Sequence, residues 1–245
     1  MIYVTGDTHG DTDFFKLFMF SVLNDGLTRE DYVIIAGDFG GIWSQEKLEE
    51  DLAPYEKLPF TVLFVDGNHE NFDLLESYPT KEWKGGLIRE IKPNIFHLTR
   101  GQVFTIEGKK IFTFGGATSV DKWRRVEGES WWARELPDET DLFTAVDNLE
   151  KHHFTVDYII THSCDEKAFY MLPYYARAAK TGVSPEVPFL SYFEDRVEYK
   201  HWYFGHFHLD KPLSDKKTVL YQEIVPIDQF PALKKEEKKE GKTGE

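Results

Sequence analysis

The chain has almost no cysteine, because Cys164 is the only one among its 245 residues. One thiol cannot form an intrachain disulfide, so the small secreted scaffolds that disulfides hold together are excluded. We interpret Cys164 as a structural thiol.

The sequence also lacks membrane and export signals. No uninterrupted apolar run approaches the ~20 residues that a membrane-spanning helix needs. The N-terminus, Met-Ile-Tyr-Val-Thr-Gly-Asp, has neither the basic nor the apolar region of a signal peptide and is typical of a buried strand. We therefore expect a cytoplasmic protein that does not contact a membrane.

Positive charge is scarce. The chain has 29 Lys and Arg residues but 43 Asp and Glu residues, which gives a formal net charge of −14. Such a surface repels a polyanion, so extended binding of nucleic acid is not expected. A small phosphate ester is not excluded, because bound divalent cations can reverse the sign of the charge locally.

Hydrophobic residues, in contrast, make up 41% of the chain, and 16% of it is aromatic. Short apolar runs rich in β-branched residues alternate with longer amphipathic stretches, a pattern that predicts a layered α/β fold. We expect one large domain over residues 1–233. Residues 234–245 are mostly Lys and Glu, and this charged tail is expected to be disordered. The composition indicates no oligomeric state.

The coarse pattern predicts nine strands and three helices. The expected strands are Ile2–Thr5, Tyr32–Ala36, Phe60–Val65, Ile95–Leu98, Gln102–Ile106, Lys110–Phe114, Tyr158–Ile160, Trp202–Phe204 and Val219–Ile224. The expected helices are Phe14–Leu23, with Thr12 as its cap, Gln45–Lys57 and Leu142–His152. Residues 115–141 show little periodicity and are interpreted as a long functional loop.

Five of these strands end in a similar way, at a Gly, Thr or Asn beside an Asp or a His. The five ends are Thr5-Gly6-Asp7, Ala36-Gly37-Asp38, Asp66-Gly67-Asn68-His69, Ile160-Thr161-His162 and Phe204-Gly205-His206. In open α/β sheets, ligand sites lie just beyond the carboxyl ends of the strands. We therefore expect these side chains to converge.

The side chains at these ends are of the types that bind metals. The set is Asp7, His9, Asp38, Asn68, His162, His206 and His208. Seven ligands are too many for one tetrahedral ion but fit two ions that share a carboxylate, and this mixture suits Mn, Fe, Zn or Ni. Two ions about 3.5–4 Å apart clamp a phosphoryl group and acidify a bridging water. The set therefore predicts hydrolysis of a phosphate ester.

Each residue has a simpler explanation when it is taken singly. Asp and Asn beside Gly are common in turns, and one histidine is more often structural than functional. Four further histidines are given no role: His97, His152, His153 and His201. Joint occurrence at five strand ends is what favours the metal site.

These segments resemble the five sequence blocks of the calcineurin-like metallophosphoesterase superfamily. The matching segments are Gly6-Asp7-Thr8-His9-Gly10, Gly37-Asp38, Gly67-Asn68-His69-Glu70, His162 and Gly205-His206-Phe207-His208. The resemblance implies a four-layer αββα sandwich of two mixed β-sheets with a two-metal site at their upper edge. Mn or Fe is expected at this site ahead of Zn or Ni.

The resemblance also implies individual roles. The ligands of one metal would be Asp7, His9 and His208, those of the other Asn68, His162 and His206, with Asp38 as the bridge. Asn68 and His69 would contact the substrate, and His69 could protonate the leaving oxygen if it lies within hydrogen-bond reach. Glu70 could orient His69 through its ring N–H.

The second block departs from that of the protein serine/threonine phosphatases. Their block reads Gly-Asp-x-Val-Asp-Arg-Gly, and its arginine contacts phosphate. Here the block is Gly37-Asp38-Phe39-Gly40-Gly41-Ile42-Trp43, without that arginine. A phosphoprotein phosphatase is therefore the weaker alternative. A non-catalytic binding module of the same fold is the other, although every ligand position and His69 are filled.

The loop of residues 115–141 offers another source of positive charge for a small phosphorylated substrate. Arg124 and Arg125 could bind phosphate through paired hydrogen bonds, and the neighbouring tryptophans Trp123, Trp131 and Trp132 could stack on a nucleobase. Nucleotide-like substrates are thus weakly favoured.

The alternative for this loop is packing. Its tryptophans would then bury it against the fold, and its arginines would pair with Glu127, Glu129 and Glu135. A second expected wall of the site is Ala168–Phe193, with Tyr170, Tyr174, Tyr175 and Arg177.

Overall fold

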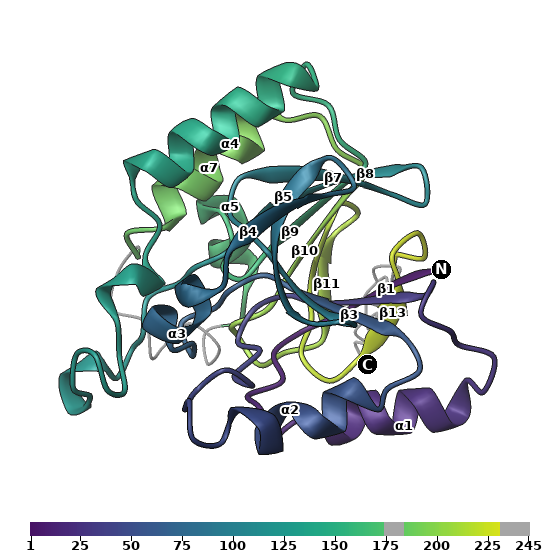
Figure 1. Cartoon of the computed structure of the whole chain (residues 1–245). Helices are drawn as coiled ribbons and strands as arrows, with labels where there is room; N and C mark the ends of the chain where they lie inside the picture. The colour runs from purple at the N-terminus through teal and green to yellow at the C-terminus, as the bar shows by residue number, and fades with distance from the viewer. Residues whose placement is uncertain (174–183, 231–245) are drawn as a thin grey trace, which may run out of the picture.

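The computed structural model describes residues 1–173 and 184–230 (Figure 1). The charged tail expected at 234–245, and the expected wall residues Tyr174, Tyr175 and Arg177, lie outside these described residues. Within the described ranges, no helix has both the length and the apolar character needed to cross a membrane.

Two β-sheets lie face to face, and helices cover the outer side of each (Figure 1). Between the sheets lies a buried cluster that includes Val4, Ile34, Leu63, Ile160 and Tyr203. A second cluster lies under the helices of the N-terminal half, and a third lies under those of the C-terminal half. The predicted αββα sandwich is therefore confirmed. Strands buried on both faces explain why the sequence shows continuous apolar runs.

The first sheet is mixed and has the strand order β13-β1-β2-β3-β6-β5-β4. Its strands are β1 Ile2–Thr5, β2 Tyr32–Ile35, β3 Thr61–Phe64, β4 Thr80–Trp83, β5 Gly86–Lys92, β6 Ile95–Leu98 and β13 Ile224–Pro226. The central strands β1, β2, β3 and β6 are parallel. The carboxyl ends of β1, β2 and β3 therefore lie at one edge of the sheet.

The second sheet is also mixed and has the order β11-β12-β10-β9-β8-β7. Its strands are β7 Gln102–Ile106, β8 Lys109–Phe114, β9 Tyr158–Thr161, β10 His201–Phe204, β11 Lys211–Ser214 and β12 Lys217–Val219. β9 and β10 are parallel neighbours, with Thr161 paired to Phe204. Their two following histidine-bearing segments thus leave the sheet together.

Helices cover both sheets. They are α1 Phe15–Leu23, α2 Leu48–Glu56, α3 Phe72–Ser77, α4 Glu139–Lys151, α5 Glu166–Met171 and α7 Val187–Arg196. α1 and α2 lie under the first sheet, and α4 and α7 lie over the second (Figure 1). α4 begins three residues before its predicted start because Asp138 and Asp141 form a capping box there. Before the start of α4, the long loop contains two short 3₁₀ turns, Lys122–Arg124 and Ala133–Glu135.

The expectation that Thr12 caps α1 is wrong. The helix begins at Phe15, with Phe14 in the cap position and no side-chain cap hydrogen bond. The backbone N–H of Thr12 donates to His9 O at 3.3 Å, so this residue belongs to the turn after β1.

The expected strand Val219–Ile224 is also wrong, because this segment divides between the two sheets as the end of β12 and the start of β13. The carboxylate of Asp210 accepts three consecutive backbone N–H groups, from Tyr221 at 2.7 Å and from Gln222 and Glu223 at 3.0 Å. A carboxylate that satisfies three donors replaces the ladder of a strand. The chain can therefore leave one sheet and enter the other.

Candidate metal centre

The carboxyl ends of five strands bring the predicted ligands together from both sheets. Asp7, Asp38 and Asn68 follow β1, β2 and β3, whereas His162 follows β9 and His206 follows β10. Three groups of residues each offer ligand atoms that all lie within 4.8 Å of one another. The groups are Asp7, His9 and His208; His9, Asp38 and His69; and Asp38, His162 and His206.

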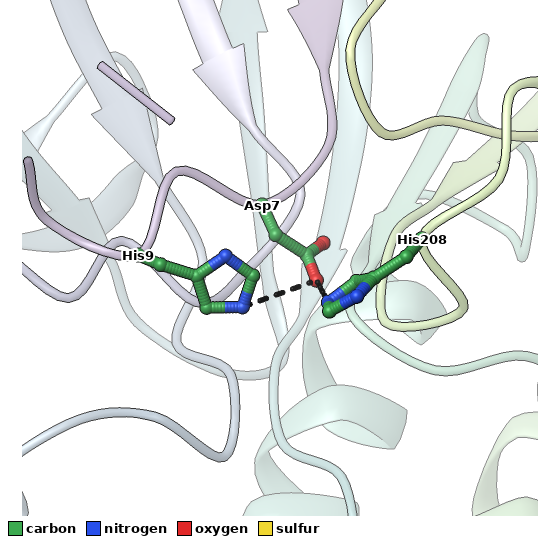
Figure 2. Close-up of side chains that lie close together, drawn as sticks. All are labelled: Asp7, His9 and His208. Atoms are coloured by element: carbon green, nitrogen blue, oxygen red, sulfur yellow. Dashed lines mark ion pairs between the residues drawn. The ribbon is translucent and has the colours of Figure 1, made fainter. Parts of the chain in front are cut away.

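The first group is centred on the buried carboxylate of Asp7, with the rings of His9 and His208 on either side (Figure 2). Asp7 Oδ2 lies 3.3 Å from His208 Nε2 and 3.9 Å from His9 Nε2. Asp7 Oδ1 accepts the backbone N–H of His206 at 2.9 Å. Oδ2 is fully buried and accepts no hydrogen bond within the described part of the chain. A buried, unsatisfied carboxylate oxygen beside two imidazoles fits a bound cation.

The third group contains His162, which is fully buried. Its Nδ1 lies 2.8 Å from the carbonyl oxygen of Ala36, to which it donates, and this bond turns Nε2 toward the other ligands. Nε2 lies 3.2 Å from Asp38 Oδ1 and 3.2 Å from Asn68 Oδ1. Asp38 Oδ2 lies 3.5 Å from His9 Nε2 in the first group. Asp38 therefore lies between the two groups, where the bridging residue was expected.

The electrostatics of the site also fit bound cations. Burial lowers the pKa of the His162 imidazole, but the carboxylates of Asp38 and Asp7 and the carbonyl of Ala36 together outweigh it and raise the pKa to about 9. Burial also lowers the pKa of the His9 imidazole, but the carboxylates of Asp38, Asp13 and Asp7 together raise it to about 9. Buried carboxylates thus draw positive charge onto the histidines. Divalent ions would supply that charge and leave the imidazoles neutral, which is the form that binds metals.

The ligand loops have unusual backbone conformations. Four of the candidate ligands have positive φ: His9 at 45°, Asp38 at 48°, His206 at 67° and His208 at 48°. Side chains with a β-carbon rarely adopt this region, and its occurrence is typical of functional sites. Gly37 permits close packing here, because a β-carbon on it would lie 2.0 Å from Nδ1 of His162.

The His69 ring has a different neighbour from the one expected. Glu70 is fully buried, and its carboxylate accepts the backbone N–H groups of Phe39 at 2.8 Å and Gly40 at 3.2 Å. Glu70 therefore holds the turn after Asp38. The ring of His69 lies instead against Arg125, with Nη1 3.2 Å from Nδ1 and Nη2 3.4 Å from Nε2.

One part of the long loop packs against the fold, and another part reaches the site. Trp132 is buried and donates from Nε1 to Asp73 at 2.8 Å, so this tryptophan packs. Arg125 reaches the site, whereas Arg124 is exposed and stacks on Trp123, which is 74% exposed.

Glu135, one of the glutamates expected as partners of the loop arginines, has a different partner. Glu135 is buried and binds Ser119, while Arg134 pairs with Glu76 and Asp141.

Two positioning residues of the first loop were missed by the sequence reasoning. Asp13, which lies between β1 and α1, accepts from His9 Nδ1 at 2.8 Å. The Lys16 ammonium donates to the carbonyl oxygens of Gly6 at 3.0 Å and Asp7 at 2.6 Å, and also to that of Tyr221. The available signals were the four-residue spacing from His9 to Asp13 and one lysine inside an apolar helix.

Comparison with solved structures finds distant likenesses, which include the two that follow. A protein of unknown function from Aquifex aeolicus is 17% identical, with a TM-score of 0.34 over 68% of this chain and 81% of that one. A phosphopantetheinyl hydrolase from Mycobacterium tuberculosis is 14% identical, with a TM-score of 0.40 over 90% of this chain and 87% of that one. No curated protein matches the sequence.

The family comparison is more direct. Residues 1–210 match the family model described as calcineurin-like phosphoesterase. This range contains all five strand ends that carry the ligand side chains. The chain belongs to the calcineurin-like phosphoesterase family.

Proposed function

We propose that the chain is a two-metal phosphoesterase that hydrolyses a small phosphate monoester or diester. The observation that carries the proposal is the position of Asp38 between two donor groups, each of which draws residues from both sheets. One ion would be held by Asp7, His9 and His208, the other by Asn68, His162 and His206, and Mn or Fe suits this donor set. When bound, the ions supply Lewis acidity and a more acidic water.

The chain's own residues would then bind the ester and move a proton. His69 belongs to the donor group with His9 and Asp38, so its ring faces the space where the phosphate would lie. A ring in that position can donate a proton to the leaving oxygen. Arg125 adds a fixed cation at the same place and can donate paired hydrogen bonds to phosphate oxygens.

The substrate would be small and nucleotide-like. Trp123 lies exposed two residues from Arg125, and a flat group attached to the phosphate could stack on it. The net charge of −14 favours a compact ester over a nucleic-acid strand. The residues after Asp38 supply two backbone donors to Glu70 and no arginine, which disfavours the protein phosphatase alternative.

The test is a panel of nucleotides, phosphorylated metabolites and an aryl phosphodiester, assayed with Mn²⁺ and with His69→Ala as the blank. We expect two ions per chain by metal analysis and at least one substrate whose hydrolysis falls by about 10²-fold or more in the variant. Fewer than two ions after reconstitution would refute the metal centre. Equal rates for parent and variant would refute the role of His69.

A further inference from the structure

Three buried side chains form a line that leads from the metal centre into the long loop. Asn68 Nδ2 donates to the Ser119 hydroxyl at 3.3 Å. That hydroxyl donates to Glu135 Oε2 at 2.6 Å, and the Ser119 backbone N–H donates to Glu135 Oε1 at 2.9 Å. All three residues are at least nine-tenths buried, so these bonds are shielded from bulk water.

The direction of each hydrogen bond follows from which atoms carry protons. An ionised carboxylate only accepts, so Glu135 takes the single hydroxyl proton of Ser119. The Ser119 oxygen is then left as an acceptor, and it must face the NH₂ group of Asn68 rather than its carbonyl. The other end of the amide, Oδ1, consequently points toward His162, 3.2 Å away. That oxygen is the only atom of the side chain that can bind a metal.

We propose that Glu135, acting through Ser119, is a positioning residue that keeps the carbonyl oxygen of Asn68 turned toward the metal centre. This inference rests on the proposed function, because it assumes that Asn68 is a ligand. A positioning role can be told apart from simple packing. Packing depends on the shape of Glu135, whereas positioning depends on the direction of its hydrogen bonds.

Replacement of Glu135 by glutamine reverses the direction of the hydrogen bonds along this line, while the side chain at position 135 keeps its size. If Oε1 still accepts the Ser119 N–H, the new NH₂ group donates to the hydroxyl, whose proton then points toward Asn68. The amide must turn its NH₂ group to the metal centre or lose the bond. We expect Glu135→Gln to weaken Mn²⁺ binding by about 10- to 100-fold, as outer-shell partners of metal ligands do. Ser119→Ala only removes the constraint, so a smaller loss is expected.

The decisive variant is the combination of Glu135→Gln with Asn68→Asp. A carboxylate at position 68 offers oxygen in both directions and accepts the redirected hydroxyl proton. The double variant should therefore bind Mn²⁺ more tightly than Asn68→Asp alone, although Glu135→Gln by itself is harmful. Two substitutions that merely disturb packing would not show this reversal of sign.

The experiment titrates each full-length protein with Mn²⁺ by calorimetry, and NMR of the metal-free proteins follows the side-chain NH₂ group of Asn68. We expect Glu135→Gln to bind Mn²⁺ more weakly than the parent and to show a changed resonance of the Asn68 NH₂ group. The double variant should bind Mn²⁺ more tightly than Asn68→Asp alone. If the parent binds two ions and Glu135→Gln binds Mn²⁺ with the same affinity, the positioning role of Glu135 is overturned and the metal centre stands. A parent that binds no Mn²⁺ would overturn both the metal centre and the positioning role of Glu135.

Discussion

The guanidinium of Arg125 lies against the imidazole of His69, with its two terminal nitrogens 3.2 and 3.4 Å from the two ring nitrogens. Asp121 holds the same guanidinium from the other side, at 2.9 Å from Nε and 3.0 Å from Nη2. Arg124, one residue earlier, contacts Trp123 instead. Two adjacent arginines of equal charge therefore differ in whether they reach the site.

This difference gives the first prediction. Arg125→Ala should lower kcat/KM by about 10- to 100-fold, because a charge-assisted hydrogen bond to phosphate contributes about 1.5–3 kcal/mol. Arg124→Ala is the matched control and should stay within about twofold, since it removes the same charge outside the site. Steady-state kinetics on the best substrate of the panel measures both. Equal losses in the two variants would show that only the net charge of the loop matters.

Metal removal should lower the stability of the fold, because the ligands come from both sheets and a bound ion links them. At an Mn²⁺ concentration of about 100 times Kd, binding adds about 2.7 kcal/mol, which raises Tm by roughly 5–10 °C. Thermal unfolding with EDTA and with Mn²⁺ measures the shift. Asp38→Asn should nearly abolish it. A parent whose Tm does not respond to Mn²⁺ would contradict the two-sheet metal link.

Glu70→Gln should destabilise the metal-free chain by about 1–3 kcal/mol, because an amide can accept only one of the two N–H bonds and places a donor against the other. The two backbone donors are those of Phe39 and Gly40. Burial raises the pKa of Glu70 to about 8, so urea unfolding is measured in EDTA at pH 9, where this carboxyl is ionised and metals make no contribution. Glu50→Gln, at an exposed position of α2, is the control and should have almost no effect. Equal stabilities would remove Glu70 from its proposed structural role.

A buried histidine at the start of β10, at the opposite end of that strand from the candidate ligands, predicts acid sensitivity. Burial lowers the pKa of His201 from 6.5 to about 4, and its ring is stacked 4.4 Å from that of Phe230. The unfolded chain binds a proton at higher pH than the folded one, so stability falls as pH drops from 6.5 toward 4. Relative to His201→Gln, the parent should lose about 2 kcal/mol between pH 7.5 and 5. Parallel pH dependences for the two proteins in urea unfolding would contradict this.

The strands that carry the site and the clustering of the candidate ligands were predictable from the sequence for the same reason. Parallel strands buried on both faces require apolar runs, and the residue that follows each run lies at the edge of the sheet, so local pattern and site position coincide. Contacts between distant segments have no such pattern. The bond from Lys16 to Tyr221 joins residues 205 positions apart, and the three bonds of Asp210 decide where β13 begins. The turn held by Glu70 and the line through Ser119 were missed for that reason.

The positive φ angles of His9, Asp38, His206 and His208 have a consequence for how this chain could change. Each angle costs of order 1–3 kcal/mol in a residue with a side chain, whereas glycine adopts it freely. Glycine at these four positions should therefore relax the metal-free backbone while it removes a ligand. A variant library of this chain screened only for heat resistance, in the presence of chelator, should lose its ligands before its core. At these four positions, the stability of the metal-free chain favours glycine, whereas the proposed chemistry requires a side chain that binds metal.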